Sequence, residues 1–286
     1  MKNEFICYKR MPVWTARSLP QMFQEKHNTK VGTWGKMTIL KGKLKFYELT
    51  EEGEILREHI FTPDTPTPFV EHELWHKVEP LTDDLECYLE FHCKKEDYFS
   101  KKYNMTPPHS EVKYAVERLT PCKVLDLGSG QGRNALFLSL LGYEVTAWDH
   151  KEDSLRFLKD TAEKEHLNIQ TALYDINSAN IQEYYDFILS TVVFMFLDAE
   201  RIPAIIKNMQ EHTHSGGYNL IVSAMSTQDF PCPMPFSFTF KEGELKQYYQ
   251  DWELVKYNEE MGELHKTDEN GNRIKMKFVT MLAKKK

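Results

Sequence analysis

From about residue 110 onward, short runs of apolar residues alternate with segments whose apolar positions recur every three or four residues. The runs are typical of buried strands, and the wider spacing is typical of amphipathic helices. The predicted strands are 123–127, 144–148, 169–174, 186–191 and 218–223, and the predicted helices lie near 110–119, 132–141, 153–165 and 199–212. This alternation predicts an α/β fold, a doubly wound parallel sheet with helices on both faces.

The pattern changes after residue 230. The proline-broken segment PCPMP is followed by a short predicted helix near 242–250 and by two predicted strands, 252–258 and 273–282. Asn270-Gly271, between these strands, is a strong signal for a tight turn. We therefore expect the last strand of the sheet to be antiparallel.

Residues 1–93 have the pattern of a small all-β module. The segment TILKGKLKFYELTEEGEIL predicts three strands that reverse at Gly42 and Gly53, and shorter strands are predicted at 69–70 and 85–91. Strands this short and evenly spaced favour a sandwich or an open barrel.

Residues 94–109 read as a charged connector, because Pro107-Pro108 disfavours helix before it. We therefore expect two domains, 1–93 and 94–286.

The composition narrows the protein class. Apolar residues make up 41% and charged residues 28%, as in ordinary folded domains, and the net charge of −7 argues against a broad nucleic-acid surface. The longest apolar-dominated run, 188–197, is about half the length of a membrane span, and the charged N-terminus is unlike a signal peptide. Five cysteines without a C-x-x-C pair indicate reduced thiols, so we expect a cytoplasmic protein.

The first predicted βα unit carries a glycine-rich turn, VLDLGSGQGRN. Gly128 and Gly130 allow a tight turn without a Cβ beside a ligand, and Gly132 opens a helix whose N-terminal amides favour negative charge. A plain tight turn would also explain them.

Carboxylates end three successive predicted strands, at Asp126, Asp149 and Asp175. A carboxylate at Asp149 can accept both hydroxyls of a ribose, while Asp175 can face an adenine edge with Ile176 on the ring. The spacing G-x-G-x-G differs from the dinucleotide fingerprint. S-adenosylmethionine fits better than NAD, since it has no pyrophosphate and its cations tolerate nearby carboxylates. The alternatives are a helix cap at Asp149 and a turn residue at Asp175.

These motifs carry a resemblance. VLDLGSGQGRN and YDFILSTVVFMFL resemble class I S-adenosylmethionine-dependent methyltransferases, and HSEV, GGYNLIV and GELHKTDENGNRIK narrow the resemblance to the TehB-type tellurite-resistance methyltransferases. The resemblance implies a class I methyltransferase fold, S-adenosylmethionine as cofactor, and methylation of tellurite or related selenium oxyanions. It also implies a cupin-like β domain over 1–93. The family commonly has Cys where Ser129 stands.

Further residues are expected at the cofactor. Ser190 and Thr191 end the fourth strand, where they would contact the methionine end or would cap backbone. Tyr98, Tyr103 and His109 would form a lid or would pack on the sheet edge. The residues expected to bind the cofactor are Asp126, Gly128, Ser129, Gly130, Gly132, Arg133, Asn134, Asp149, Asp175, Ile176, Ser190, Thr191, Tyr98, Tyr103 and His109.

An oxyanion substrate needs a local cationic pocket in an acidic protein. His265, Lys266 and Arg273 bracket the Asn270-Gly271 turn and are the expected catalytic residues, although the family usually has Arg at position 266. A solvated hairpin with ordinary surface cations is the alternative. Cys232, in PCPMP, lies near the expected substrate mouth, but a lone loop cysteine is more often inert.

His27 and His76 in the β domain suggest a degenerate cupin metal site. Its H-x-H pair is incomplete, so we expect no metal there. Association of two or more chains through the β domain is an open alternative. In the second domain, we expect Phe194, Met195 and Phe196 to lie in the core.

Other functions remain open: methylation of another small molecule at O, N or S, a non-catalytic sensor of the cofactor, and an NAD-dependent oxidoreductase. The segment STVV lacks an N-P-P-Y-like motif, which disfavours amino methylation of bases or glutamine.

Overall fold

The computed structural model describes residues 5–65, 67–267 and 269–286, without the side chains of His265 and Lys266. The chain forms two compact units, Met1–Thr106 and Pro107–Lys286. The sequence predicted a boundary between residues 93 and 94. That residues 94–286 fold independently stays a prediction.

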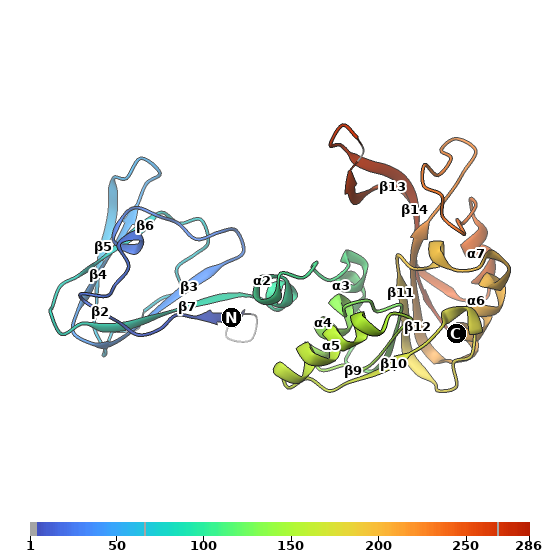
Figure 1. Ribbon diagram of the computed structural model, residues 1–286, viewed down its shortest axis with the longest axis horizontal. Coiled ribbons are helices and arrows are strands. Elements are labelled where there is room, and N and C mark those ends of the chain that lie inside the picture. Colours follow the sequence, from blue (N-terminus) through green and yellow to red (C-terminus); the bar gives the residue numbers. More distant parts are fainter. Residues whose placement is uncertain (1–4, 66, 268) are drawn as a thin grey trace. The chain divides into compact units, whose positions relative to one another are not determined.

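The first unit is all-β, as expected (Figure 1). One antiparallel sheet has the order β1-β7-β2 with β3 also paired to β7, and the other has the order β5-β4-β6. Apolar side chains that include Leu44, Leu85 and Cys87 form its buried core. The strands are β1 Phe5–Arg10, β2 Trp14–Thr15, β3 Trp34–Lys41, β4 Leu44–Leu49, β5 Ile55–Phe61, β6 His76–Pro80 and β7 Glu86–Lys94, and a short helix, α1, spans Gln21–Gln24.

The connector contains a helix, so the expectation that Pro107-Pro108 disfavours helix before it was wrong. A 3-10 turn, η1 (Lys95–Asp97), leads into α2 (Tyr98–Tyr103). Tyr98 and Phe99 are buried, which stabilises the helix. The prolines restrict only the residues directly before them, and α2 ends before that point, where Asn104 adopts a left-handed conformation (φ 55°).

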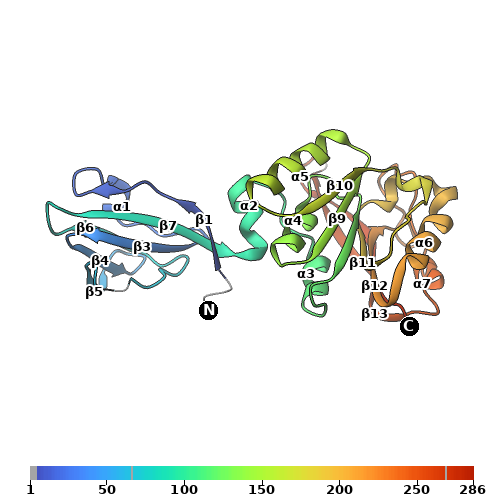
Figure 2. The ribbon, with the colours of Figure 1, turned by 90° about the horizontal axis from the view of Figure 1, so that it is seen from below.

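The second unit is a doubly wound α/β domain whose last strand, β14, is antiparallel to its neighbours, as expected (Figures 1 and 2). Its sheet has the order β10-β9-β8-β11-β12-β14-β13. The neighbours from β10 to β12 pair in parallel, and β14 pairs antiparallel with both β12 and β13. The strands are β8 Lys123–Leu127, β9 Glu144–Asp149, β10 Ile169–Leu173, β11 Tyr185–Thr191, β12 Thr213–Ala224, β13 Glu253–Thr267 and β14 Arg273–Lys284.

Helices cover both faces of this sheet. Figure 1 shows α3, α4 and α5 on one side and α6 and α7 on the other. The helices are α3 Ser110–Val116, α4 Arg133–Leu140, α5 Glu152–Lys164, α6 Ile202–Glu211 and α7 Glu244–Tyr248, with 3-10 turns η2 Ile176–Ser178, η3 Phe194–Phe196 and η4 Ala199–Arg201. None of the helices in the described ranges is long and apolar enough to span a bilayer.

The strand order indicates where a ligand-binding crevice is expected on this sheet. The chain runs from β8 outward to β9 and β10 on one side, then returns to β11 and β12 on the other. In such sheets ligands bind outside the carboxyl ends of the strands where the direction reverses. That point lies between β8 and β11.

Candidate functional site

The glycine-rich turn between β8 and α4 is held by the neighbouring strand. The backbone N–H groups of Gly128 and Ser129 donate to the carbonyl oxygen of Trp148 at 2.8 and 3.0 Å. A Cβ on Gly132 would lie 2.3 Å from Leu158 Cδ1, so packing requires glycine there. At Gly130 (φ 55°) a Cβ would meet nothing within 4 Å, so this residue borders open space.

Asp149 ends β9 and is almost fully buried. Its Oδ2 accepts from the Gly130 N–H at 2.8 Å, and its Oδ1 accepts from the Lys151 N–H at 2.8 Å. It does not cap α5, whose N-cap residue is Lys151. Each oxygen keeps further acceptor capacity, so the carboxylate fixes the turn and can still receive two hydroxyls.

Asp126, at 1% exposure, is the most strongly perturbed carboxyl of this region. Burial raises the pKa of Asp126 to about 7, Asp149 adds to the rise, and the Arg133 guanidinium opposes it. Its Oδ2 and the buried Ser129 Oγ have no hydrogen-bond partner among the described residues. A cation placed beside Asp126 would favour its ionised form, so these groups fit a positively charged ligand.

A chain of hydrogen bonds joins three of the expected residues. The backbone N–H of His109 donates to Asn134 Oδ1 at 2.9 Å, and Asn134 Nδ2 donates to Thr191 Oγ1 at 3.0 Å. The chain therefore ties the start of α3 and the first turn of α4 to the end of β11.

His109 caps α3, because its Nδ1 accepts from the Glu111 N–H at 3.2 Å. Ser110, a residue type that is common at helix caps, is instead the first residue of α3. Burial, with smaller effects of Arg133 and Lys256, lowers the pKa of His109 to about 4. The imidazole is therefore neutral at physiological pH.

Ser190 is fully buried and donates from Oγ to the Leu127 carbonyl oxygen at 3.0 Å. This bond favours the backbone-capping interpretation for Ser190, whereas Thr191 faces Asn134.

At the end of β10, Asp175 is exposed and Ile176 is buried. Asp175 Oδ1 accepts from the Asn177 N–H at 2.9 Å and so caps η2. Beside them the Trp148 and Tyr174 rings pack with centroids 4.5 Å apart. Asp175 therefore has the turn role that was the alternative, and its second oxygen is not used in that cap.

Tyr98 and Tyr103 lie on α2, in the first unit. Tyr98 OH accepts from Lys102 Nζ at 2.7 Å. Their expected place over the cofactor stays a prediction.

Val192 and Val193, directly after β11, were missed by sequence reasoning. Val192 has φ 62°, a conformation that is strained for a β-branched residue, and its N–H donates to the Val222 carbonyl oxygen at 2.7 Å. A Cβ on Gly128 would lie only 2.5 Å from Val193 Cγ2, so Val193 packs where a larger residue at position 128 would need space. No local sequence signal marks either residue, because the strain depends on tertiary contacts.

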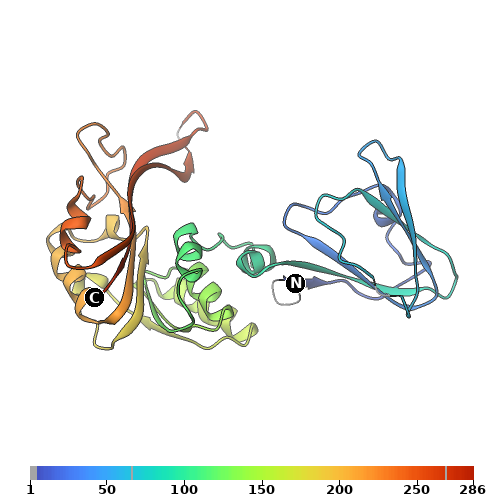
Figure 3. The same cartoon turned by 180° about the vertical axis from the view of Figure 1, so that it is seen from behind.

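The β13–β14 hairpin extends past the carboxyl end of β12, as Figure 3 shows from behind. The last pair between β12 and β14 is Ala224 with Phe278, and Arg273 lies beyond it. The exposed Arg273 and Lys275 border a surface hollow of ≈ 500 Å³ together with Pro233, Met234, Asn272 and Ile274. The side chains of His265 and Lys266 lie outside the described residues. Lys275 is a cation that the sequence analysis did not single out.

Met276 of β14 forms a small apolar cluster with Met195 and Ala224, and Cys232 packs against it. This packing favours an inert role for Cys232. Phe194 and Met195 are buried as expected, but Phe196 is 63% exposed and is not a core residue. The reason is that η3 is a single turn, which cannot bury three consecutive side chains.

Across the ranges that the structure describes, no group of three or more His, Cys, Asp or Glu side chains is arranged to hold a metal ion.

Known proteins resemble the chain over both units. The family model described as "Tellurite resistance protein TehB" matches residues 91–282, and the model described as "TehB-like domain" matches residues 9–89. The probable S-adenosyl-L-methionine-dependent methyltransferase TehB of Haemophilus influenzae (strain 10810) is 74% identical over the full length of both chains.

One solved structure and one further protein are also similar to this chain. The crystal structure of TehB from Haemophilus influenzae superposes with a TM-score of 0.97 and 74% identity, covering all of both chains. A protein named Hemagglutinin 1 from Eikenella corrodens is 57% identical over 84% of this chain and 80% of its own length.

Proposed function

Because this chain belongs to the TehB family and is an S-adenosylmethionine-dependent methyltransferase, we propose that its substrates are tellurite and related selenium oxyanions. Methylation of these ions would contribute to tellurite resistance. The observation that carries the proposal is the match to a tellurite-resistance family over almost the whole second unit.

The residues at the carboxyl ends of β8 and β9 fit the cofactor. Gly130 borders open space, Asp149 retains acceptor capacity for ribose hydroxyls, and Asp126 presents an unpartnered buried oxygen to a cation. The Trp148–Tyr174 pair offers an apolar wall near Ile176 for an adenine. When bound, S-adenosylmethionine supplies an electrophilic methyl carbon on a sulfonium whose sulfur departs as a neutral thioether.

The chain's own contribution is mainly positioning. A tellurium or selenium lone pair needs no deprotonation before it attacks carbon. His109, which borders this site, is neutral and engaged in capping. The His109–Asn134–Thr191 chain holds the site walls in register. Correct orientation of two reactants supplies up to roughly 7–11 kcal/mol of a barrier.

The β13–β14 hairpin would bind the oxyanion substrate. Arg273 and Lys275 lie two residues apart on β14 and border one hollow. A guanidinium clamps two oxygens of an oxyanion, and the ammonium adds a point charge. Together they form a local positive site in a protein of net charge −7.

A turnover assay tests the proposal. Purified full-length protein is incubated with S-adenosylmethionine and either tellurite, selenite, a thiol or a catechol, and S-adenosylhomocysteine is quantified. We expect tellurite and selenite to stimulate product formation well above the substrate-free rate. Turnover only with the thiol or the catechol would assign another small-molecule methyltransferase, and binding without turnover would assign a sensor.

The cellular compartment that we propose is the cytoplasm. All five cysteines are unpaired thiols, and such thiols persist in reducing compartments.

A further inference from the structure

The first unit contains a cavity of its own, between its two sheets and α1. The cavity has a volume of ≈ 570 Å³. Its walls are mostly apolar and include Phe23, Met37, Phe46, Leu89 and Phe91. Small-molecule sites typically measure about 300–1,000 Å³ and combine an apolar lining with a few placed polar groups.

Two histidines supply the inner polar groups. The backbones of His27 and His76 exchange two N–H···O hydrogen bonds, at 3.0 and 2.8 Å. This pairing brings the centroids of the two imidazole rings to 4.2 Å from each other. His27 Nδ1 bonds the Glu25 carbonyl oxygen at 2.9 Å, and His76 Nδ1 bonds the Leu74 carbonyl oxygen at 2.7 Å. A carbonyl can only accept, so each Nδ1 carries the proton.

Both imidazoles are uncharged at neutral pH. Burial lowers the pKa of His27, and burial together with the neighbouring His27 lowers the pKa of His76 to about 4. Nε2 is then a bare acceptor on each ring, and among the described residues it has no hydrogen-bond partner. A ligand would meet this pair with an N–H or O–H group and not with a negative charge.

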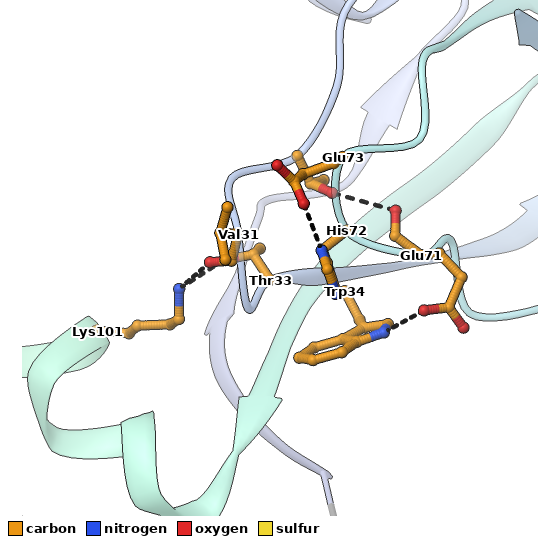
Figure 4. A network of polar contacts seen from close by, with 8 residues as sticks. Val31, Thr33, Trp34, Glu71, His72, Glu73 and Lys101 are labelled. Atoms are coloured by element: carbon orange, nitrogen blue, oxygen red, sulfur yellow. Dashed lines mark hydrogen bonds and ion pairs between the residues drawn. The ribbon is translucent and has the colours of Figure 1, made fainter.

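The same cavity has a positive border. Lys9, Lys30 and Lys101 line it, and the first two are exposed. Lys101 Nζ is fixed by the Val31 carbonyl oxygen at 3.0 Å and Thr33 Oγ1 at 2.9 Å (Figure 4). Neither Lys9 nor Lys30 forms an ion pair with a carboxylate of the described chain.

We propose that this cavity binds a small amphipathic organic anion. Its apolar or aromatic body lies on the phenylalanines, a hydrogen-bond donor meets Nε2 of His76, the buried member of the pair, and its acidic group lies at the lysines. The site is separate from the proposed oxyanion methylation, and its occupant is not a substrate of it.

A pair of fluorescent probes tests the proposal on the full-length protein. Anilinonaphthalene sulfonate has an aromatic body, one N–H group and a sulfonate, and N-phenylnaphthylamine has the same rings and N–H without the charge. An excess of S-adenosylhomocysteine occupies the methyltransferase site throughout. We expect one molecule of the sulfonate to bind per chain, at least about tenfold more tightly than the uncharged probe, because only the sulfonate meets the lysines.

Variants then separate the polar contacts. Lys9→Glu/Lys30→Glu should weaken sulfonate binding at least about tenfold and leave the uncharged probe unaffected, since both side chains are exposed and reversal should not disturb folding. The matched control is Lys43→Glu/Lys94→Glu, two exposed lysines of the same unit outside the cavity, which should change neither probe. His76→Phe keeps a ring against Phe46 but removes the acceptor, and should weaken both probes.

Failure of both probes to bind when S-adenosylhomocysteine is present would overturn the proposal. Equal effects of the two lysine pairs would do the same, because they would assign binding to general surface charge. Unchanged binding to a folded His76→Phe protein would overturn the role of the His76 imidazole in the proposed site. None of these outcomes depends on tellurite turnover, so the methylation proposal stands or falls separately.

Discussion

Asp149 and Gly130 are joined by a hydrogen bond of 2.8 Å from the glycine N–H to Oδ2. The carboxylate that we propose to bind the ribose therefore also holds the middle of the glycine turn. The proposed ligand contact and the turn geometry depend on the same side chain.

Asp149→Ala should accordingly weaken S-adenosylmethionine binding by more than the loss of one ligand contact. Hydrogen bonds to a charged acceptor are worth roughly 1.5–3 kcal/mol, or about 10- to 150-fold in affinity. Calorimetry measures the effect, and Asp160→Ala, an exposed carboxylate on α5, is the control that should bind normally. An unchanged affinity in Asp149→Ala would remove this residue from the cofactor site.

Asp126 should make the ligand-free protein lose stability as the pH rises. Its folded pKa of about 7 lies above the unfolded value of about 3.9, so between these values the folded state holds a proton that the unfolded state has released. The free energy of unfolding should therefore fall as pH rises from about 4 to about 7. Urea denaturation across this range should show a smaller fall in Asp126→Asn, which should also bind S-adenosylmethionine more weakly. Parallel pH profiles for the two proteins would argue against a raised pKa.

The glycines should separate folding from binding. Gly132→Ala forces a methyl group against Leu158 at a positive φ, so its melting temperature should fall. Gly130→Ala meets no atom of the chain and should lose only about 1–2 kcal/mol to backbone strain. Its methyl group would nevertheless occupy the space assigned to the cofactor, and calorimetry should show weakened binding. Wild-type affinity in Gly130→Ala would place the cofactor elsewhere.

Arg273→Ala and Lys275→Ala should each lower kcat/KM for tellurite by roughly ten- to a hundredfold, as for one charge-assisted contact. His265→Ala should act likewise, and its effect should vary between about pH 5 and 8 if the imidazolium binds the anion. Cofactor affinity should not change, because these residues lie on the β13–β14 hairpin, away from the glycine turn. Lys207→Ala, an exposed cation on α6, serves as the control. If all three variants keep wild-type turnover, the cationic hairpin model is wrong.

Residues 107–286 should fold alone and bind S-adenosylmethionine, since the whole seven-stranded sheet and the glycine turn lie within them. Circular dichroism and calorimetry on this fragment check both properties, with the full-length chain as reference. An insoluble fragment would mean that the first unit is needed for folding of the second.

The sequence predicted the sheet of the second unit because its central strands are buried on both faces. A strand such as β11 then appears as one apolar run, and the glycines mark where the chain must turn. The β6 strand was missed because HKVEP contains one aliphatic residue, Val78, and its pattern is too weak to recognise. The α2 helix was missed because its stability comes from the burial of Tyr98 and Phe99, a tertiary effect.

The site was predicted only as far as residue type reveals it. Carboxylates at strand ends were identifiable, but the strain at Val192 and the neutral state of His109 depend on neighbours distant in sequence. The cavity of the first unit could not be predicted from the sequence either, because its lining residues on β3, β4, β6 and β7 come together only after folding.

The position of β14 makes the end of this chain unusually sensitive to premature stop codons. In the described sheet β13 pairs with β14 alone, and β14 is what joins it to β12. A stop codon shortly after Thr267 would therefore cost two strands, although it deletes one. It would also bare the long, apolar edge of β12, and such an edge is a template for pairing with other chains. A protein truncated by such a stop codon should consequently aggregate in the cell and should not persist as a folded enzyme of reduced activity.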